Sequence, residues 1–260
     1  MALNDALRLA ADGVLGVLFA PACAACGELL DRPTDGPVCA ACWAGVACTS
    51  PPFFSPHLIE RGRAAGLYDG SLRDIIHAFK YDGRRSLASR LAALMHAGGA
   101  DVLEGVRCVV PVPLHPWRHL RRGFNQSADL ARHLPVPVVH ALWRVRVTAP
   151  QTGLSAAGRR RNVASVFALS PWLAFRARRQ RWLDDQVVVL VDDVRTTGAT
   201  LEACAEVLKS AGVREVRALT IALRQQPARQ PILGQEDARH RGESIRLAPG
   251  ADSSRARGRA

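Results

Sequence analysis

Two adjacent carboxylates followed by a threonine-rich loop are the residues of this chain best suited to chemistry. Asp192 and Asp193 come directly after the apolar run 187–191, and the loop 195–200, with the sequence RTTGAT, follows them. Threonine hydroxyls and backbone N–H groups, opened by a glycine at the start of a helix, form a concave set of donors that suits a phosphate monoester. Carboxylates repel phosphate, so their place beside such a loop indicates a second role as acceptors for two vicinal hydroxyls. The pattern indicates a phosphorylated ribose as ligand, and the alternative is a strand end whose acids are merely solvated.

A strand followed by a helix must position these groups. The run 187–191 is apolar and mostly β-branched, as in a strand of a parallel sheet that is buried on both faces. Leu201, Ala205 and Leu208 then recur at helical spacing, and Gly212 is suited to end that helix. Further strands are predicted at 63–68, 108–113 and 216–223, with helices between them.

Four cysteines near the N-terminus have the spacing of a metal site, Cys23-x2-Cys26-x12-Cys39-x2-Cys42. Two CxxC pairs at this separation are typical of a zinc ion held tetrahedrally by four thiolates. Such a site leaves no open coordination position, so its role is structural, and the metal supplies folding energy that a module this small does not obtain from a core. Disulfides are the alternative, but they do not fit a chain without a secretory signal. Redox sensing by the same cysteines is a further alternative.

The chain is strongly basic, with a formal net charge of +12 that is carried almost wholly by arginine. Such a charge favours polyanions or phosphorylated small molecules as ligands. Aromatic residues make up only 5% of the chain, which argues against binding single strands mainly by base stacking. Three basic groups lie near predicted helix ends and are candidate anion ligands, with solvated surface charges as the alternative. They are Lys80, then Arg118, Arg121 and Arg122, and then Arg159, Arg160 and Arg161.

Changes in composition divide the chain into four parts. Residues 1–20 predict an amphipathic helix that packs on the body of the protein, and residues 21–50 form the cysteine module. The prolines at 51 and 52 indicate a linker, residues 60–224 form the α/β domain, and residues 225–260 have the composition of a disordered basic tail. Neither a secretory signal nor a run of about 18 apolar residues is visible, so we expect no membrane span and a cytoplasmic location.

Five motifs, in the same order, resemble those of the ComF family of amidophosphoribosyltransferase-like competence proteins of bacteria. They are the four-cysteine element, FKYDG from Phe79, PVPLHPWRHLRRGFNQS from Pro111, QTGLSAAGRRRNV from Gln151 and VLVDDVRTTGAT from Val189. The last motif is similar to the one with which type I phosphoribosyltransferases bind phosphoribosyl pyrophosphate (PRPP). Arg195 departs from that motif, because an apolar residue often stands at its place, and nothing functional is transferred to residues 171–182 or to the tail.

The resemblance implies an α/β fold of the type I phosphoribosyltransferase class, with a parallel sheet, helices on both faces, and a small four-cysteine zinc-ribbon module before it. It also implies PRPP, bound with Mg²⁺, at the carboxyl ends of the strands. Asp192 and Asp193 would hold the ribose hydroxyls, and Thr196, Thr197, Gly198, Ala199 and Thr200 the 5′-phosphate. The pyrophosphate of PRPP would be bound by Arg118, Arg121 and Arg122, with Lys80 and Arg159, Arg160 and Arg161 as further candidates.

Two functions of different class are consistent with these features. In the first, the protein is a phosphoribosyltransferase that uses PRPP and an unidentified acceptor, and it is linked to the uptake of transforming DNA. No residue is identified as a catalytic general base, which such a reaction tolerates because orientation and charge stabilisation carry most of it. In the second, the fold has no catalytic activity, and its anion site and basic surface bind single-stranded DNA or a DNA-translocating partner.

Overall fold

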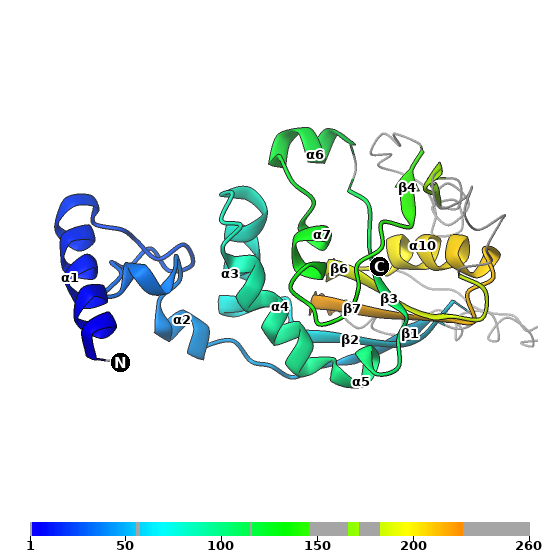
Figure 1. Ribbon diagram of the computed structural model, residues 1–260, viewed down its shortest axis with the longest axis horizontal. Coiled ribbons are helices and arrows are strands. Elements are labelled where there is room, and N and C mark those ends of the chain that lie inside the picture. The colour runs from blue at the N-terminus through cyan, green and yellow to red at the C-terminus, as the bar shows by residue number, and fades with distance from the viewer. Residues whose placement is uncertain (1, 56–57, 115, 146–165, 172–182, 226–260) are drawn as a thin grey trace, which may run out of the picture. The chain divides into compact units, whose positions relative to one another are not determined.

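The computed structural model describes residues 2–55, 58–114, 116–145, 166–171 and 183–225 of the chain (Figure 1). The candidate anion ligands Arg159, Arg160 and Arg161 lie outside these residues, as do residues 226–260 of the predicted tail. Within the described residues the protein is a mixed α/β structure built around a mostly parallel five-stranded sheet, which confirms the predicted fold class.

Five strands make up the sheet: β1 Pro52–Ser55, β2 Ile59–Leu67, β3 Cys108–Pro111, β6 Val187–Arg195 and β7 Glu215–Leu223. Their order is β1-β2-β7-β6-β3, in which β1 is antiparallel to β2 and the other pairs are parallel. Strands far apart in the sequence are therefore neighbours, because parallel strands need long crossover connections. β6 pairs with β7 on one side and with β3 on the other, so it is an inner strand of the sheet.

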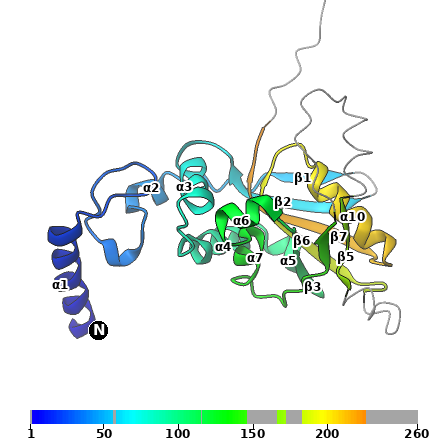
Figure 2. The same cartoon turned by 90° about the horizontal axis from the view of Figure 1, so that it is seen from above.

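Helices cover both faces of this sheet (Figures 1 and 2). Alternate side chains of β6 serve opposite faces, since Val189 and Val191 pack in one core cluster while Val188 and Leu190 pack in another. The first cluster is covered by α3 Gly70–Tyr81, α4 Leu87–Gly98, α5 Ala100–Leu103 and α7 Gln126–Ala131. The second is covered by α10 Ala199–Ser210 and by the hairpin of β4 Leu142–Arg144 and β5 Phe167–Leu169.

β6 is longer than the predicted strand 187–191 and includes the acid pair. It continues to Arg195 because the ladder with β7 runs on through Asp192. Gly198, with a φ of 84°, then turns the chain into α10, and Gly212, with a φ of 92°, follows the end of that helix as predicted. The predicted apolar positions of α10 are all buried: Leu201, Ala205 and Leu208.

The N-terminal segment contains helix α1 Ala2–Phe19, the short 3-10 helix η1 Pro33–Asp35 and helix α2 Ala40–Ala44. The helix predicted for residues 1–20 is thus present. It is joined to η1 by a hydrogen bond of 2.9 Å, which the Thr34 N–H donates to the buried Asp12 carboxylate. Some of its large apolar side chains, including Leu9 and Val17, are exposed. Among the described residues, no helix combines the length and the apolar character needed to cross a membrane.

Some local predictions are wrong. Pro52, interpreted as part of a linker, begins the edge strand β1, where a residue without an N–H group is tolerated. The sequence suggests Ser71 as the cap of α3, but Asp69 is the cap, and its carboxylate accepts the Gly70 N–H at 2.7 Å because this acid lies directly before the first turn. The sequence also suggests a basic loop before Gly123, but these arginines lie on helix α6 Pro116–Arg122.

Leu91 of α4 is fully buried in the core cluster between the helices and the sheet, so Leu91→Ala should lower the free energy of unfolding by about 2–5 kcal/mol. Leu120→Ala is the matched control, because Leu120 is 77% exposed. The control should change the free energy of unfolding by no more than about 0.5 kcal/mol. Urea denaturation measures both, and equal losses would contradict the packing described here.

Candidate functional site

Seven of the predicted site residues line one cavity of about 640 Å³ at the ends of β3 and β6. The carboxyl ends of parallel strands share one edge of the sheet, and ligands of open α/β folds bind there. The cavity brings together both acids, two threonines of the loop and three cationic side chains: Asp192, Asp193, Thr196, Thr200, Lys80, Arg121 and Arg122. Residues more than 100 positions apart in the chain therefore form one surface.

The two carboxylates have different partners. The Lys80 Nζ lies 2.8 Å from the Asp193 Oδ1, and both side chains are largely buried, at 13% and 15% exposure. The Asp192 Oδ1 accepts hydrogen bonds from the Ser127 Oγ at 3.0 Å and from the Asp193 N–H at 2.9 Å. Burial raises the pKa of Asp192 to about 7, the charge of Asp193 acts in the same direction, and the two hydrogen bonds and Lys80 oppose them. Asp192 therefore changes its charge near neutral pH, while Asp193 is paired with a cation.

The loop after the acids has the geometry of an anion cradle. Gly198 adopts a left-handed conformation directly before α10, and the Thr197 Oγ1 accepts the Ala199 N–H at 3.5 Å. The side chains of Thr196, Thr197 and Thr200 are exposed or line a hollow of about 30 Å³ within the loop. Hydroxyls and free N–H groups at the start of a helix can thus face an oxygen-rich anion.

Cationic side chains approach the acids from two helices. Lys80 comes from the end of α3, and Arg121 and Arg122 come from the end of α6. The Arg122 Nη1 donates to the Gln126 Oε1 at 3.2 Å, and its guanidinium lies 4.7 Å from the centre of the Tyr81 ring. Arg118 belongs to α6, but its side chain lies outside the described residues.

Sequence reasoning did not assign several residues that line this cavity. Tyr81 follows Lys80 in the FKYDG motif, which was the one signal available for it. Tyr68 and Arg224 come directly after β2 and β7, and the Arg224 guanidinium lies 5.9 Å from the Tyr68 ring centre. They share the cavity because these two strands are parallel neighbours. The polar and aromatic lining residues that were not assigned are Tyr68, Tyr81, Ser127, Arg144 and Arg224.

A second, mostly apolar cleft of about 1050 Å³ adjoins the first. The two clefts share Pro113, Leu114 and Arg144. Phe124 and Trp143 contribute aromatic surface to the second cleft. It suits an uncharged, flat or apolar group, whereas the first cleft suits charged and hydroxylated groups.

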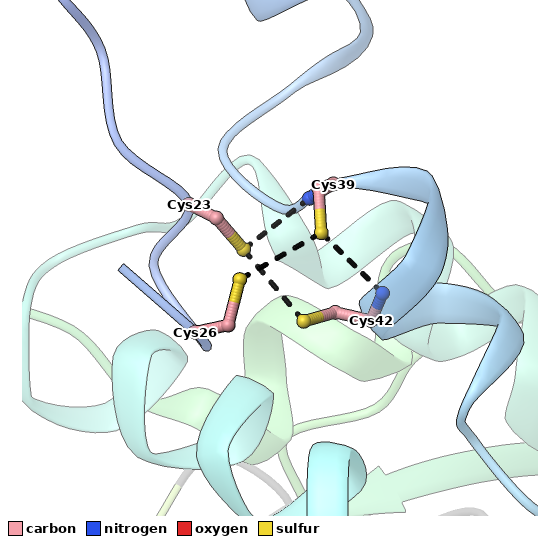
Figure 3. Close-up of side chains that lie close together, drawn as sticks. All are labelled: Cys23, Cys26, Cys39 and Cys42. Carbon is pink, nitrogen blue, oxygen red and sulfur yellow. Dashed lines mark hydrogen bonds between the residues drawn. The ribbon is translucent and has the colours of Figure 1, made fainter. Parts of the chain in front are cut away.

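The four cysteines of the N-terminal module face one another (Figure 3). Their Sγ atoms all lie within 4.8 Å of one another, and the distances Cys23–Cys42 and Cys26–Cys39 are both 3.9 Å. Sulfurs of a tetrahedral zinc site are about 3.8 Å apart, given Zn–S bonds of about 2.3 Å. Backbone N–H groups donate to these sulfurs, as they do from Cys39 to the Cys23 Sγ at 3.3 Å and from Cys42 to the Cys39 Sγ at 3.4 Å. The predicted cluster is present and can hold a metal ion.

Comparison with known proteins agrees with this geometry. The family model of the phosphoribosyl transferase domain matches residues 120–233. Competence protein F of Haemophilus influenzae is 34% identical over 168 residues, which are 60% of this chain and 70% of that protein. DNA utilization protein YhgH of Escherichia coli K12 is 36% identical over 161 residues, 58% of this chain and 66% of that protein. Competence protein ComFC of Bacillus subtilis is 25% identical over 156 residues, 60% of either chain.

A mostly parallel sheet, with an inner strand that carries an acid pair near its carboxyl end and leads into a threonine loop, defines a protein of the phosphoribosyltransferase fold together with the domain match. Two further observations identify the family within this fold: the four-cysteine cluster that precedes it and the similarity to competence protein F. The chain belongs to the ComF family.

The raised pKa of Asp192 makes stability depend on pH. An unfolded aspartate has a pKa of about 3.9, so Asp192 stabilises the fold fully below about pH 4, and this stability is lost as the pH rises through about 7. Asp192→Asn removes the charge and keeps the acceptor oxygen. We expect the variant to be more stable than the parent by about 1–3 kcal/mol at pH 8, and similar to it at pH 5.

Thermal unfolding at the two pH values measures this difference. Asp193→Asn is the matched control, because it breaks the ion pair with Lys80 and should lower stability at pH 8. A stability difference between Asp192→Asn and the parent that does not change with pH would contradict the assignment.

Proposed function

We propose that this protein binds PRPP in the cavity at the ends of β3 and β6 and transfers its phosphoribosyl group to an acceptor. The observation that supports the proposal is the meeting of an acid pair, threonines of a phosphate-type loop and several cationic side chains in one cavity. Asp192 and Asp193 accept hydrogen bonds from the two vicinal hydroxyls of the ribose. Residues 196–200 receive the 5′-phosphate through hydroxyls and the N–H groups that begin α10.

The pyrophosphate of the ligand would lie toward the cations. Arg121 and Arg122 are the closest candidates, because both line the cavity, and guanidinium groups match phosphate oxygens in pairs. Lys80 neutralises Asp193 and so reduces the repulsion that a pyrophosphate would meet beside the acid pair. Arg118 and residues 159–161 remain candidates from the sequence. The carboxylate oxygens fit a hard cation, and Mg²⁺, when bound, neutralises charge on the leaving pyrophosphate.

The chemistry needs little from a general base. A nucleophile displaces pyrophosphate at the C1 atom of the ribose, and positive charge develops on the sugar. The residues of this chain contribute by fixing the sugar and by balancing charge on the leaving group. The adjoining apolar cleft borders the charged one at Pro113 and Leu114, which would let an acceptor approach the sugar from that side.

The names of the relatives support a link between this protein and DNA uptake. The matched proteins are called competence protein F, competence protein ComFC and DNA utilization protein YhgH. We infer that the present chain serves natural competence or the use of incoming DNA, from the cytoplasmic side of the membrane. Its high positive charge suits contact with nucleic acid in that setting.

PRPP binding tests the proposal directly. We expect titration calorimetry with PRPP and Mg²⁺ to detect one site, and the double variant Asp192→Asn with Asp193→Asn to weaken binding by a factor of about ten or more. Asp185→Asn is the control, because this exposed aspartate lies outside the cavity and asparagine tolerates its positive φ. If the double variant binds PRPP as tightly as the parent, the acid pair does not hold the ribose. Release of pyrophosphate with candidate acceptors then measures turnover.

We further propose that the four cysteines hold one structural zinc ion. The module packs on the rest of the fold, because Cys23, Leu30 and Val38 belong to the same core cluster as α3. The Arg90 guanidinium of α4 also lies 4.3 Å from the centre of the Trp43 ring, next to Cys42. Loss of the metal would therefore loosen both the module and helix α3, which carries Lys80 in its last turn.

Removal of one ligand tests the zinc site. Cys42→Ser should lower the metal content well below one zinc per chain and lower the melting temperature, since metal binding contributes to folding. Cys48→Ser is the matched control, because Cys48 is exposed and lies outside the cluster. Elemental analysis and thermal unfolding provide the measurements. Full zinc content in Cys42→Ser would exclude the four-thiolate site.

A further inference from the structure

Arg195 occupies an unusual place beneath the loop that precedes α10. It is the last residue of β6 and borders the small hollow formed with residues 196–200. A Cβ atom added at Gly198 would lie 2.9 Å from the Arg195 Nη2 and 3.2 Å from its Cζ, so the guanidinium lies directly against the loop backbone. Gly198 favours this close approach because it has no side chain, and its φ of 84° is one that other residues rarely adopt.

The same guanidinium rests on an aromatic ring from the edge strand. Its Cζ lies 4.7 Å from the centre of the Phe53 ring of β1. The Phe53 ring in turn covers Gly62 of β2, where an added Cβ atom would overlap the ring. Gly62, Phe53, Arg195 and Gly198 thus form a continuous set of contacts, which we call the arginine column. It connects the edge of the sheet to the loop.

The charge of this arginine is only partly balanced. Its Nε is buried and has no hydrogen-bond partner among the described residues. Burial lowers the pKa of Arg195, and the carboxylate of Glu202 opposes that shift, but arginine stays protonated in proteins. Glu202 also accepts a hydrogen bond from the Ser55 Oγ at 3.0 Å. A buried donor without a partner is costly, so an anion held nearby would explain why the charge is retained.

We infer that Arg195 is a specificity-determining residue that raises the affinity of the loop 196–200 for a doubly charged phosphate monoester. The inference rests on the proposed function and adds a residue to it. Arg195 lines the same hollow as the threonines of the loop, and its guanidinium lies against the loop backbone at Gly198. A fixed positive charge at this position, partly shielded from water, attracts a dianion more strongly than it attracts a monoanion or a neutral sugar.

Binding of ribose 5-phosphate and of inorganic pyrophosphate to Arg195 variants tests the inference. Arg195→Met keeps a side chain of similar length on Phe53 but removes the charge, and Arg195→Lys keeps the charge. We expect Arg195→Met to bind ribose 5-phosphate about tenfold more weakly, and Arg195→Lys to stay within about threefold of the parent. Both variants should bind pyrophosphate within about twofold of the parent, because that ligand belongs to the side lined by Arg121 and Arg122.

Each outcome decides between the alternatives. Unchanged binding of ribose 5-phosphate by Arg195→Met overturns the inference and leaves the proposed function standing. Equal weakening of the binding of both ligands also overturns it, because the arginine then only supports the fold, and melting temperatures measure that support.

If Arg195→Met does not fold, Arg195→Gln replaces it. A parent protein that binds PRPP but not ribose 5-phosphate overturns the inference alone, and a parent that binds neither overturns the proposed function as well.

Discussion

Two carboxylates side by side at the end of a buried strand are the constraint on which the rest of this structure depends. Burial and the neighbouring charge of Asp193 both oppose the ionisation of Asp192 and raise its pKa. The fold compensates with Lys80 from α3, with Ser127 from α7 and with backbone N–H groups of β6 itself. Each compensating group comes from a different element, so α3 and α7 must be fixed against β6 before the pair is balanced.

Packing on one face of the sheet fixes those helices. Phe79, which precedes Lys80, is fully buried and meets the ring of Phe124 at a centroid distance of 5.7 Å. Arg85 donates two hydrogen bonds, of 2.7 and 3.0 Å, to the buried Asp129 of α7, and its guanidinium lies 5.1 Å from the centre of the Phe124 ring. The turn after α3 and the helix α7 are therefore joined by apolar and charged contacts together.

The parts of the site that are adjacent in the chain could be predicted from the sequence, and the parts assembled by strand order could not. The run 187–191 is too uniformly apolar for anything but a strand buried on both faces, and the groups that follow it act as neighbours in any fold. Ser127 reaches Asp192 across 65 residues, and no local pattern indicates that contact. In the sequence, Arg195 stands out only as a departure from a motif. Its position in the fold could not be predicted, because its guanidinium lies on Phe53, which belongs to a different strand.

The sequence predicts residues 21–50 as a four-cysteine module separate from the α/β domain. The strand that follows them nevertheless belongs to the other part of the molecule, because β1 places Phe53 under the Arg195 guanidinium. A recombination joint at residue 60, where the second domain was expected to begin, would take away this aromatic layer and open the underside of the loop to water. Exchange of the cysteine module during evolution therefore has to include β1, or the recipient must supply its own ring at that edge.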